Sequence, residues 1–131
     1  MTAASRTESA SDTEAEVGVI DGLYSLRIKM SGPRRGHATG VAVFQRGRVM
    51  GGDSFFYYTG SYSQSGGKWR GEMIVHQHTD APGLNLVFGG REVSCGFTGT
   101  FSGETAEIQG TALVGTTSVP FHARLTLRVR L

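Results

Sequence analysis

Two histidines offer the most obvious chemistry in the chain. His76 and His78 stand two positions apart in a segment of alternating polarity, a spacing that puts both imidazoles on one face of a strand. Two such imidazoles can share a metal ion, but a site needs more ligands, and the other candidates are His122, Asp53 and Cys95. Cys95 falls on the apolar face of its own segment. We therefore expect structural histidines, with no metal and no cofactor.

Asp53 is the last residue of the run Gly51-Gly52-Asp53. This run could present a catalytic aspartate or form a turn between two strands. A turn is the simpler interpretation, with glycine supplying a positive φ and the aspartate oxygen accepting hydrogen bonds from backbone amides. No nucleophile elbow, no paired carboxylates in one motif and no phosphate loop accompany it. The sequence therefore predicts that the protein is not an enzyme.

The elements that must position these residues are strands. The final segment shows the pattern best, since Val119, Phe121, Ala123, Leu125, Leu127, Val129 and Leu131 alternate with polar residues or proline. Such alternation is typical of a strand with one buried face. Similar segments predict eight strands, over residues 22–30, 37–45, 48–53, 55–63, 68–78, 91–102, 105–116 and 119–131.

Short turns that mostly carry glycine separate these segments, so neighbouring strands are expected to pair antiparallel. Glycines also lie inside the strands, where they mark bends and close approaches of the backbone. These features favour an all-β protein, an eight-stranded antiparallel up-and-down β-barrel. One short helical turn within 80–90 is the only helix that the pattern allows.

Length and charge divide the chain in two. The 131 residues support one domain, expected over 17–131, preceded by a disordered acidic tail at 1–16 with a net charge of −3. One cysteine excludes an internal disulfide, and the longest apolar runs are far shorter than the roughly 20 residues of a membrane helix. We expect a cytoplasmic protein with no membrane association.

The segments Asp21–Leu26, Gly40–Phe44, Gly47–Asp53 and Tyr58–Tyr62, taken in this order, resemble the GrlR-like family. These are small bacterial cytosolic negative regulators of type III secretion loci, with a lipocalin-like barrel. The resemblance implies the same barrel, a homodimer, and a regulatory protein that binds a transcriptional regulator. The acidic run by which the founding regulator engages its activator has no counterpart at 61–68, which contain no acidic residue.

Alternation also predicts which side chains face the barrel interior. They are almost all apolar, and small residues share the same faces, so a ligand cavity and a filled core both remain open. An alternative function is therefore a carrier or sensor that holds a small apolar ligand. The predicted cavity residues are Tyr24, Leu26, Ile28, Trp69, Met73, Val75, Phe97, Phe101, Phe121 and Leu125, and the wider inward set adds Ile108 and Leu127.

Two groups of residues are predicted to face a partner. Alternation puts Arg124, Arg128 and Arg130 on one face of the last strand, and Phe55 and Tyr57 belong to the only aromatic run. The same residues would also suit a solvated surface. The net charge of +5 over residues 17–131 is ordinary for a domain, and alternation buries two of the four residues in the aromatic run. Nucleic-acid binding is therefore not expected, and a protein partner is preferred.

Overall fold

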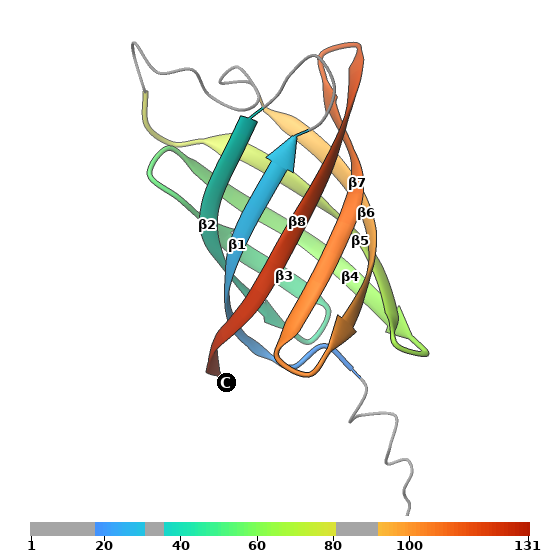
Figure 1. The fold of residues 1–131 in the computed structure, drawn as a ribbon. Helices are drawn as coiled ribbons and strands as arrows, with labels where there is room; N and C mark the ends of the chain where they lie inside the picture. The colour runs from blue at the N-terminus through green and yellow to red at the C-terminus, as the bar shows by residue number, and fades with distance from the viewer. Residues whose placement is uncertain (1–17, 31–35, 81–91) are drawn as a thin grey trace, which may run out of the picture.

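The computed structural model describes residues 18–30, 36–80 and 92–131, and these form eight strands (Figure 1). The strands are β1 (Gly22–Met30), β2 (Gly36–Gln45), β3 (Arg48–Gly52), β4 (Phe56–Ser65), β5 (Lys68–Gln77), β6 (Val93–Ser102), β7 (Thr105–Val114) and β8 (Thr117–Arg130). The described residues contain no helix. The predicted acidic tail at 1–16, and residues 81–90 of the predicted helical turn, lie outside them.

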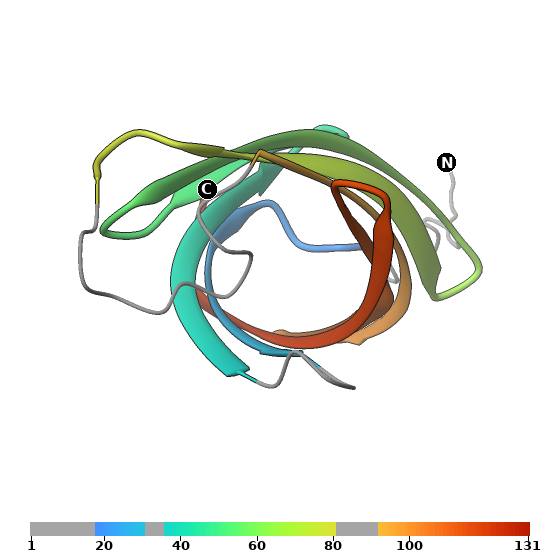
Figure 2. The ribbon, with the colours of Figure 1, turned by 90° about the horizontal axis from the view of Figure 1, so that it is seen from above.

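Each strand pairs antiparallel with its neighbour in the sequence, and β1 pairs with β8 to close the barrel. Figure 2, which looks along the barrel, shows the closed ring of strands. The predicted all-β, up-and-down architecture is therefore confirmed. Closure satisfies the backbone groups that an open sheet would leave at its two edges.

The barrel has an apolar inner face and a polar outer face because alternate side chains point to opposite sides of each strand. In β8, Val119, Phe121, Ala123 and Leu125 are all buried. The pairing with β1 then shifts register between Leu23 and Tyr24, whose partners on β8 are Val129 and Leu127.

This bulge makes one sequence prediction wrong. Strict alternation assigned Val129 and Leu131 to the inner face, but their side chains are 53% and 65% exposed. A bulge puts two residues opposite one, so the inward and outward phases change places beyond it. Leu131 lies after the end of β8, where its backbone N–H donates to the Asp21 carbonyl oxygen at 3.1 Å.

The Gly51-Gly52-Asp53 prediction is right in one part and wrong in another. Asp53 follows β3 and its Oδ1 accepts hydrogen bonds from the backbone N–H groups of Phe55 and Phe56, as the turn prediction required. Neither Gly51 nor Gly52 has a positive φ, however, and both lie within β3. Gly51 is needed for close packing, because a Cβ there would overlap the backbone of β2.

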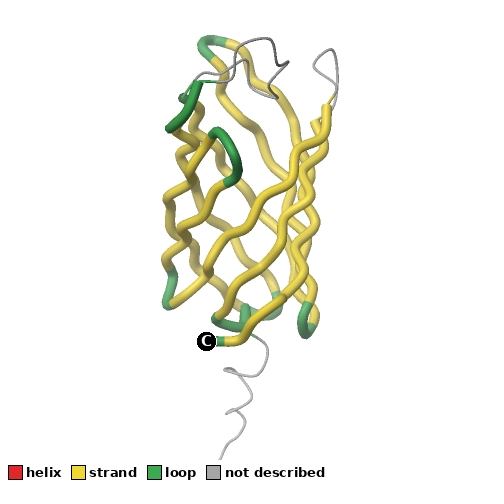
Figure 3. The backbone as a smooth tube through the Cα atoms, turned by 90° about the vertical axis from the view of Figure 1, so that its left-hand side faces the viewer, coloured by secondary structure: helices red, strands yellow, loops and turns green. Residues whose placement is uncertain are grey.

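Residues 18–21 cross the lower end of the barrel, the end at which β1 begins (Figures 1 and 2). Figure 3 shows loops at both ends of the barrel and strands between them. Val19 is buried in the core, and its N–H donates to the Gln64 side-chain oxygen at 2.5 Å. Tyr24 donates its hydroxyl to the Ile20 carbonyl at 2.6 Å, and burial raises the pKa of this phenol to about 12. This segment therefore covers the lower end of the barrel interior.

Candidate functional site

Aromatic side chains fill the lower half of the barrel. The ring of Phe44 lies 5.4 Å from Tyr24, 5.6 Å from Tyr62 and 5.3 Å from Trp69, measured between centroids. Trp69 also packs edge-on against Phe97 at 5.4 Å. These tilted and edge-to-face contacts are the arrangements that aromatic pairs prefer. The lower half is a packed core.

The upper half of the barrel, toward the end at which β1 finishes, contains a cavity of about 290 Å³. Its position follows from its lining, which comes from the upper parts of β1, β2, β4, β5, β6 and β8 and from the β3–β4 connection. Most of the lining side chains are apolar. They are Leu26, Ile28, Ala38, Phe55, Phe56, Met73, Val75 and Phe121.

One polar pair, the buried Tyr58 and the half-buried Asp53, belongs to this lining. The Tyr58 side chain, 4% exposed, donates its hydroxyl to Asp53 Oδ2 at 2.7 Å. Burial, followed by the hydrogen bond to Asp53 and its charge, raises the pKa of Tyr58 far above its ordinary value of 10.0. The phenol is therefore a neutral donor at physiological pH, held against a carboxylate that also accepts two backbone hydrogen bonds.

Four further residues with polar or sulfur-containing side chains line the cavity. His37, Thr39 and Ser54 are exposed, whereas Cys95 is a buried free thiol. Burial raises the pKa of Cys95 from 9.0 to about 11, so the thiol is protonated at neutral pH. A protonated thiol behaves as a small apolar group, which keeps this part of the lining apolar.

The predicted cavity residues divide between the two halves. Leu26, Ile28, Met73, Val75 and Phe121 line the cavity. The other five belong to the core and are absent from the lining, namely Tyr24, Trp69, Phe97, Phe101 and Leu125. The prediction found the inner face of the barrel but could not say which part of it is hollow.

Asp53, Tyr58 and His37 were missed as cavity residues. Tyr58 alternates with Phe56 and Tyr62 on the inner face of β4, so its direction was available from the sequence. Asp53 was assigned to a turn, and nothing in its local pattern indicates that the turn lies over the interior.

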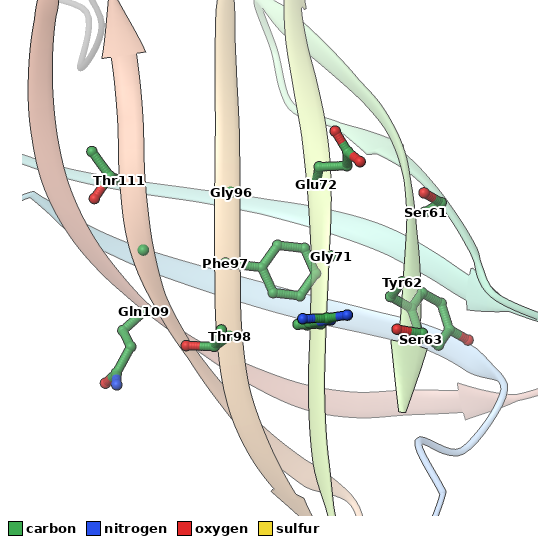
Figure 4. Close-up of a pocket in the computed structure, with 12 residues that line it drawn as sticks. Ser61, Tyr62, Ser63, Gly71, Glu72, Gly96, Phe97, Thr98, Gln109 and Thr111 are labelled. Atoms are coloured by element: carbon green, nitrogen blue, oxygen red, sulfur yellow. The ribbon is translucent and has the colours of Figure 1, made fainter. Parts of the chain in front are cut away.

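The outer face of β4–β7 carries a shallow groove, shown in Figure 4. Exposed polar side chains line it, including Arg70, Glu72, Thr98 and Gln109. Phe97 reaches its edge from the inner side, where its ring packs against Gly71. The groove is open and polar, so it lacks the enclosure that a small apolar ligand requires.

The predicted arginine surface on β8 is exposed but partly paired. Arg124 lies 3.8 Å from a carboxylate oxygen of Glu107, and Arg130 lies 3.3 Å from one of Glu104. Arg128 donates to the Ser25 hydroxyl at 2.9 Å. Exposed ion pairs contribute little to stability, so these arginines are available for other interactions.

The two residues of the predicted aromatic partner surface lie in different places. Tyr57 is outward and 44% exposed, but Phe55 is half-buried, packs on the core and lines the cavity.

Apolar side chains also gather on the outer face of β2–β5. Gly52 of β3 pairs with Val41 of β2 on one side and with Tyr57 of β4 on the other. Met50 of β3 pairs in the same way with Val43 and Thr59, and Thr59 pairs in turn with Ile74 of β5. We call the outward side chains of Val41, Val43, Met50, Tyr57 and Ile74 the outer apolar patch.

The two histidines have separate structural contacts. His76 stacks on Tyr57 at 4.8 Å and its Nδ1 lies 2.6 Å from a carboxylate oxygen of Glu92. A hydrogen bond of 3.1 Å joins His78 Nε2 to the Asp53 backbone carbonyl oxygen. Within the described part of the chain, no three His, Cys, Asp or Glu side chains are grouped closely enough to hold a metal ion.

No family model and no curated protein matches this chain. Among the residues that the structure describes, there is no helix with the length and apolar character needed to cross a membrane.

Proposed function

We propose that the protein binds one small apolar ligand in the upper cavity, as a carrier or a sensor. The observation that carries this proposal is the uneven filling of the barrel. Six aromatic side chains pack the lower half, whereas in the upper half mostly apolar side chains of the described residues line a half-open cavity of about 290 Å³. Empty apolar space costs stability, so a cavity of this size is typical of a binding site.

The volume limits the size of the ligand. An engineered apolar cavity of about 150 Å³ accommodates benzene, which has six heavy atoms. A cavity of about 290 Å³ would by proportion take a ligand of roughly 12 heavy atoms. A chain of eight to ten carbons or a substituted single ring fits this limit.

Filling the cavity tests the proposal. Ala38 lies on β2 among the cavity residues, so Ala38→Phe should occupy part of the space and exclude the ligand. Ser94→Phe is the matched control, because Ser94 is exposed on the outer face of β6. Native mass spectrometry of the purified proteins would measure bound small molecules, and calorimetry would measure the affinity for 1-octanol.

We expect ligand binding by the wild type and by Ser94→Phe, and its loss in folded Ala38→Phe. Binding that survives in Ala38→Phe would place the ligand elsewhere, and no binding by the wild type would overturn the proposal.

A second candidate is a cytoplasmic regulatory protein that binds a transcriptional regulator, as the resemblance to the GrlR-like family implies. The outer apolar patch favours a protein partner or a homodimer, since Met50, Tyr57 and Ile74 are each more than 40% exposed on neighbouring strands. Apolar patches on a soluble surface commonly mark interfaces. The β4–β5 hairpin contains no acidic residue before Glu72, so such a partner would bind through another surface.

Sedimentation velocity at micromolar concentration tests this candidate, together with capture of partners from the native cells. Ile74→Asp should convert a dimer to a monomer and abolish capture of the regulator. Thr98→Asp, which adds the same charge to the polar outer face of β6, should do neither. A wild type that is monomeric and captures no regulator would overturn the second candidate.

A further inference from the structure

The Asp53–Tyr58 pair gives the cavity a polar side that contains a carboxylate. Asp53 Oδ1 accepts from the N–H groups of Phe55 and Phe56, at 2.9 and 2.8 Å, and Oδ2 accepts from the Tyr58 hydroxyl at 2.7 Å. All three partners are donors. The group at this point of the lining is therefore a carboxylate held in place from two sides.

The carboxylate has room for one more donor. Two carboxylate oxygens offer about four lone-pair positions, and within the described residues three are filled. The open position is on Oδ2, beside the Tyr58 oxygen, which can also accept a hydrogen bond. Both residues line the cavity, so the two unfilled acceptors belong to its polar side.

The rest of the lining supplies little competing charge. The remaining cavity residue able to carry a charge near neutral pH is His37, which is exposed, and Cys95 is kept protonated by its burial. Among the described residues of the lining, Asp53 is the one acidic side chain.

We propose that the ligand is an apolar molecule ending in a hydrogen-bond donor, such as an alcohol, a phenol or an amine, and that its donor binds Asp53 Oδ2. This inference rests on the proposed function, since it specifies the ligand of the same cavity. A carboxylic acid of the same length is excluded, because its anion would lie beside Asp53. Like charges brought together in a site of low polarity repel strongly.

Two isomers with eight carbons allow the donor to be tested at constant formula and size. The molecules 1-octanol and heptyl methyl ether have the same formula and the same nine heavy atoms, but only the alcohol has a donor. We expect calorimetry at pH 8 to give 1-octanol an affinity about tenfold higher, the effect of one hydrogen bond to a charged group. Octanoate should bind more weakly than both.

Asp53→Asn tests whether Asp53 causes this preference. The asparagine oxygen can still accept from Phe55 and Phe56, which preserves the turn and puts the amide NH₂ where Oδ2 stood. The unfilled acceptor is thereby replaced by a donor. We expect 1-octanol to lose its advantage over the ether and octanoate to gain affinity, while Glu72→Gln, on the outer face of β5, changes neither ratio.

Tyr58→Phe gives a second readout that does not depend on the Asp53 substitution. It removes the internal donor from Oδ2, so the preference for 1-octanol over the ether should persist or increase. Equal binding of the two isomers to the wild type, or an unchanged ratio in folded Asp53→Asn, would overturn the donor proposal and leave the binding function standing. Failure of all three molecules to bind the wild type would overturn both.

Discussion

Phe44 is the residue on which the division of the barrel into a packed and a hollow half depends most directly. Its side chain is 2% exposed and its ring contacts three other aromatic rings with centroids within 5.6 Å. Truncation of a buried phenylalanine to alanine costs about 3–5 kcal/mol, and each aromatic contact adds about 0.5–1.5 kcal/mol beyond its buried area. We expect Phe44→Ala to lower the free energy of unfolding by roughly 4–5 kcal/mol, the upper part of the usual range, because three aromatic contacts are lost with the ring.

A loss of that size approaches the whole stability of many domains, which is about 5–15 kcal/mol. Phe44→Leu is therefore the useful companion, because it keeps most of the volume and should cost roughly 2 kcal/mol. Met50→Ala is the control, since Met50 is 56% exposed on the neighbouring strand and should change stability by less than about 0.5 kcal/mol. Urea unfolding followed by far-ultraviolet circular dichroism measures all three.

The same variants test the separation of the two halves. Phe44 does not line the upper cavity, so folded Phe44→Leu should bind 1-octanol as the wild type does. A cost below about 1.5 kcal/mol for Phe44→Ala would contradict the tightly packed lower half. A loss of ligand binding in folded Phe44→Leu as large as in Ala38→Phe would contradict the division itself.

Three further predictions concern packing and ionisation. Gly110→Ala should destabilise the protein by roughly 1–3 kcal/mol, because the added Cβ would overlap the backbone of Gly96. Gly96→Ala should be neutral or stabilise the protein by up to about 1 kcal/mol, because its Cβ would meet open space. Urea unfolding measures both free energies. Above pH 10 the unfolded state loses the Tyr58 proton, whereas the folded state keeps it, so the free energy of unfolding should fall as the pH rises. This fall should be steeper in the wild type than in Tyr58→Phe by about 1.4 kcal/mol per pH unit. Equal slopes in the two proteins would contradict the raised pKa of Tyr58. Burial raises the pKa of Cys95 to about 11, so at pH 8 the thiol of the folded protein should react with methyl methanethiosulfonate at least about a hundredfold more slowly than that of the protein unfolded in urea. Saturating ligand should slow the reaction of the folded protein further. Equal rates in the folded and unfolded protein would contradict the burial of Cys95.

The architecture was predictable because each strand shows its own period of two. The inner residues of β8 up to Leu125 follow from alternation alone, and the glycines inside the strands favoured the closed barrel that the structure has. The prediction failed at Val129 because a bulge depends on how β8 pairs with β1. Pairing involves two segments, and a pattern within one of them does not contain it.

Part of the candidate site was also predictable, although it was not found. The inner face of β2 shows the filling of the barrel directly, since Ala38 and Gly40 precede Ala42 and Phe44 toward the lower end. Small residues therefore stand at the hollow end and a large one at the packed end. Phe44 was absent from the predicted inward set, although it shares its phase with Ala42.

The polar pair could not be predicted from one segment, because three strands make it. Tyr58 extends from β4 past β3 to β2, where a Cβ at Gly40 would lie 2.6 Å from its hydroxyl oxygen. The absence of a side chain on Gly40 thus gives the hydroxyl room beside Asp53, which follows the end of β3. The glycine in β2, the turn after β3 and the tyrosine in β4 each have an ordinary local explanation. Only the register that brings them together makes Asp53 and Tyr58, with Gly40 beside them, the polar side of an apolar cavity.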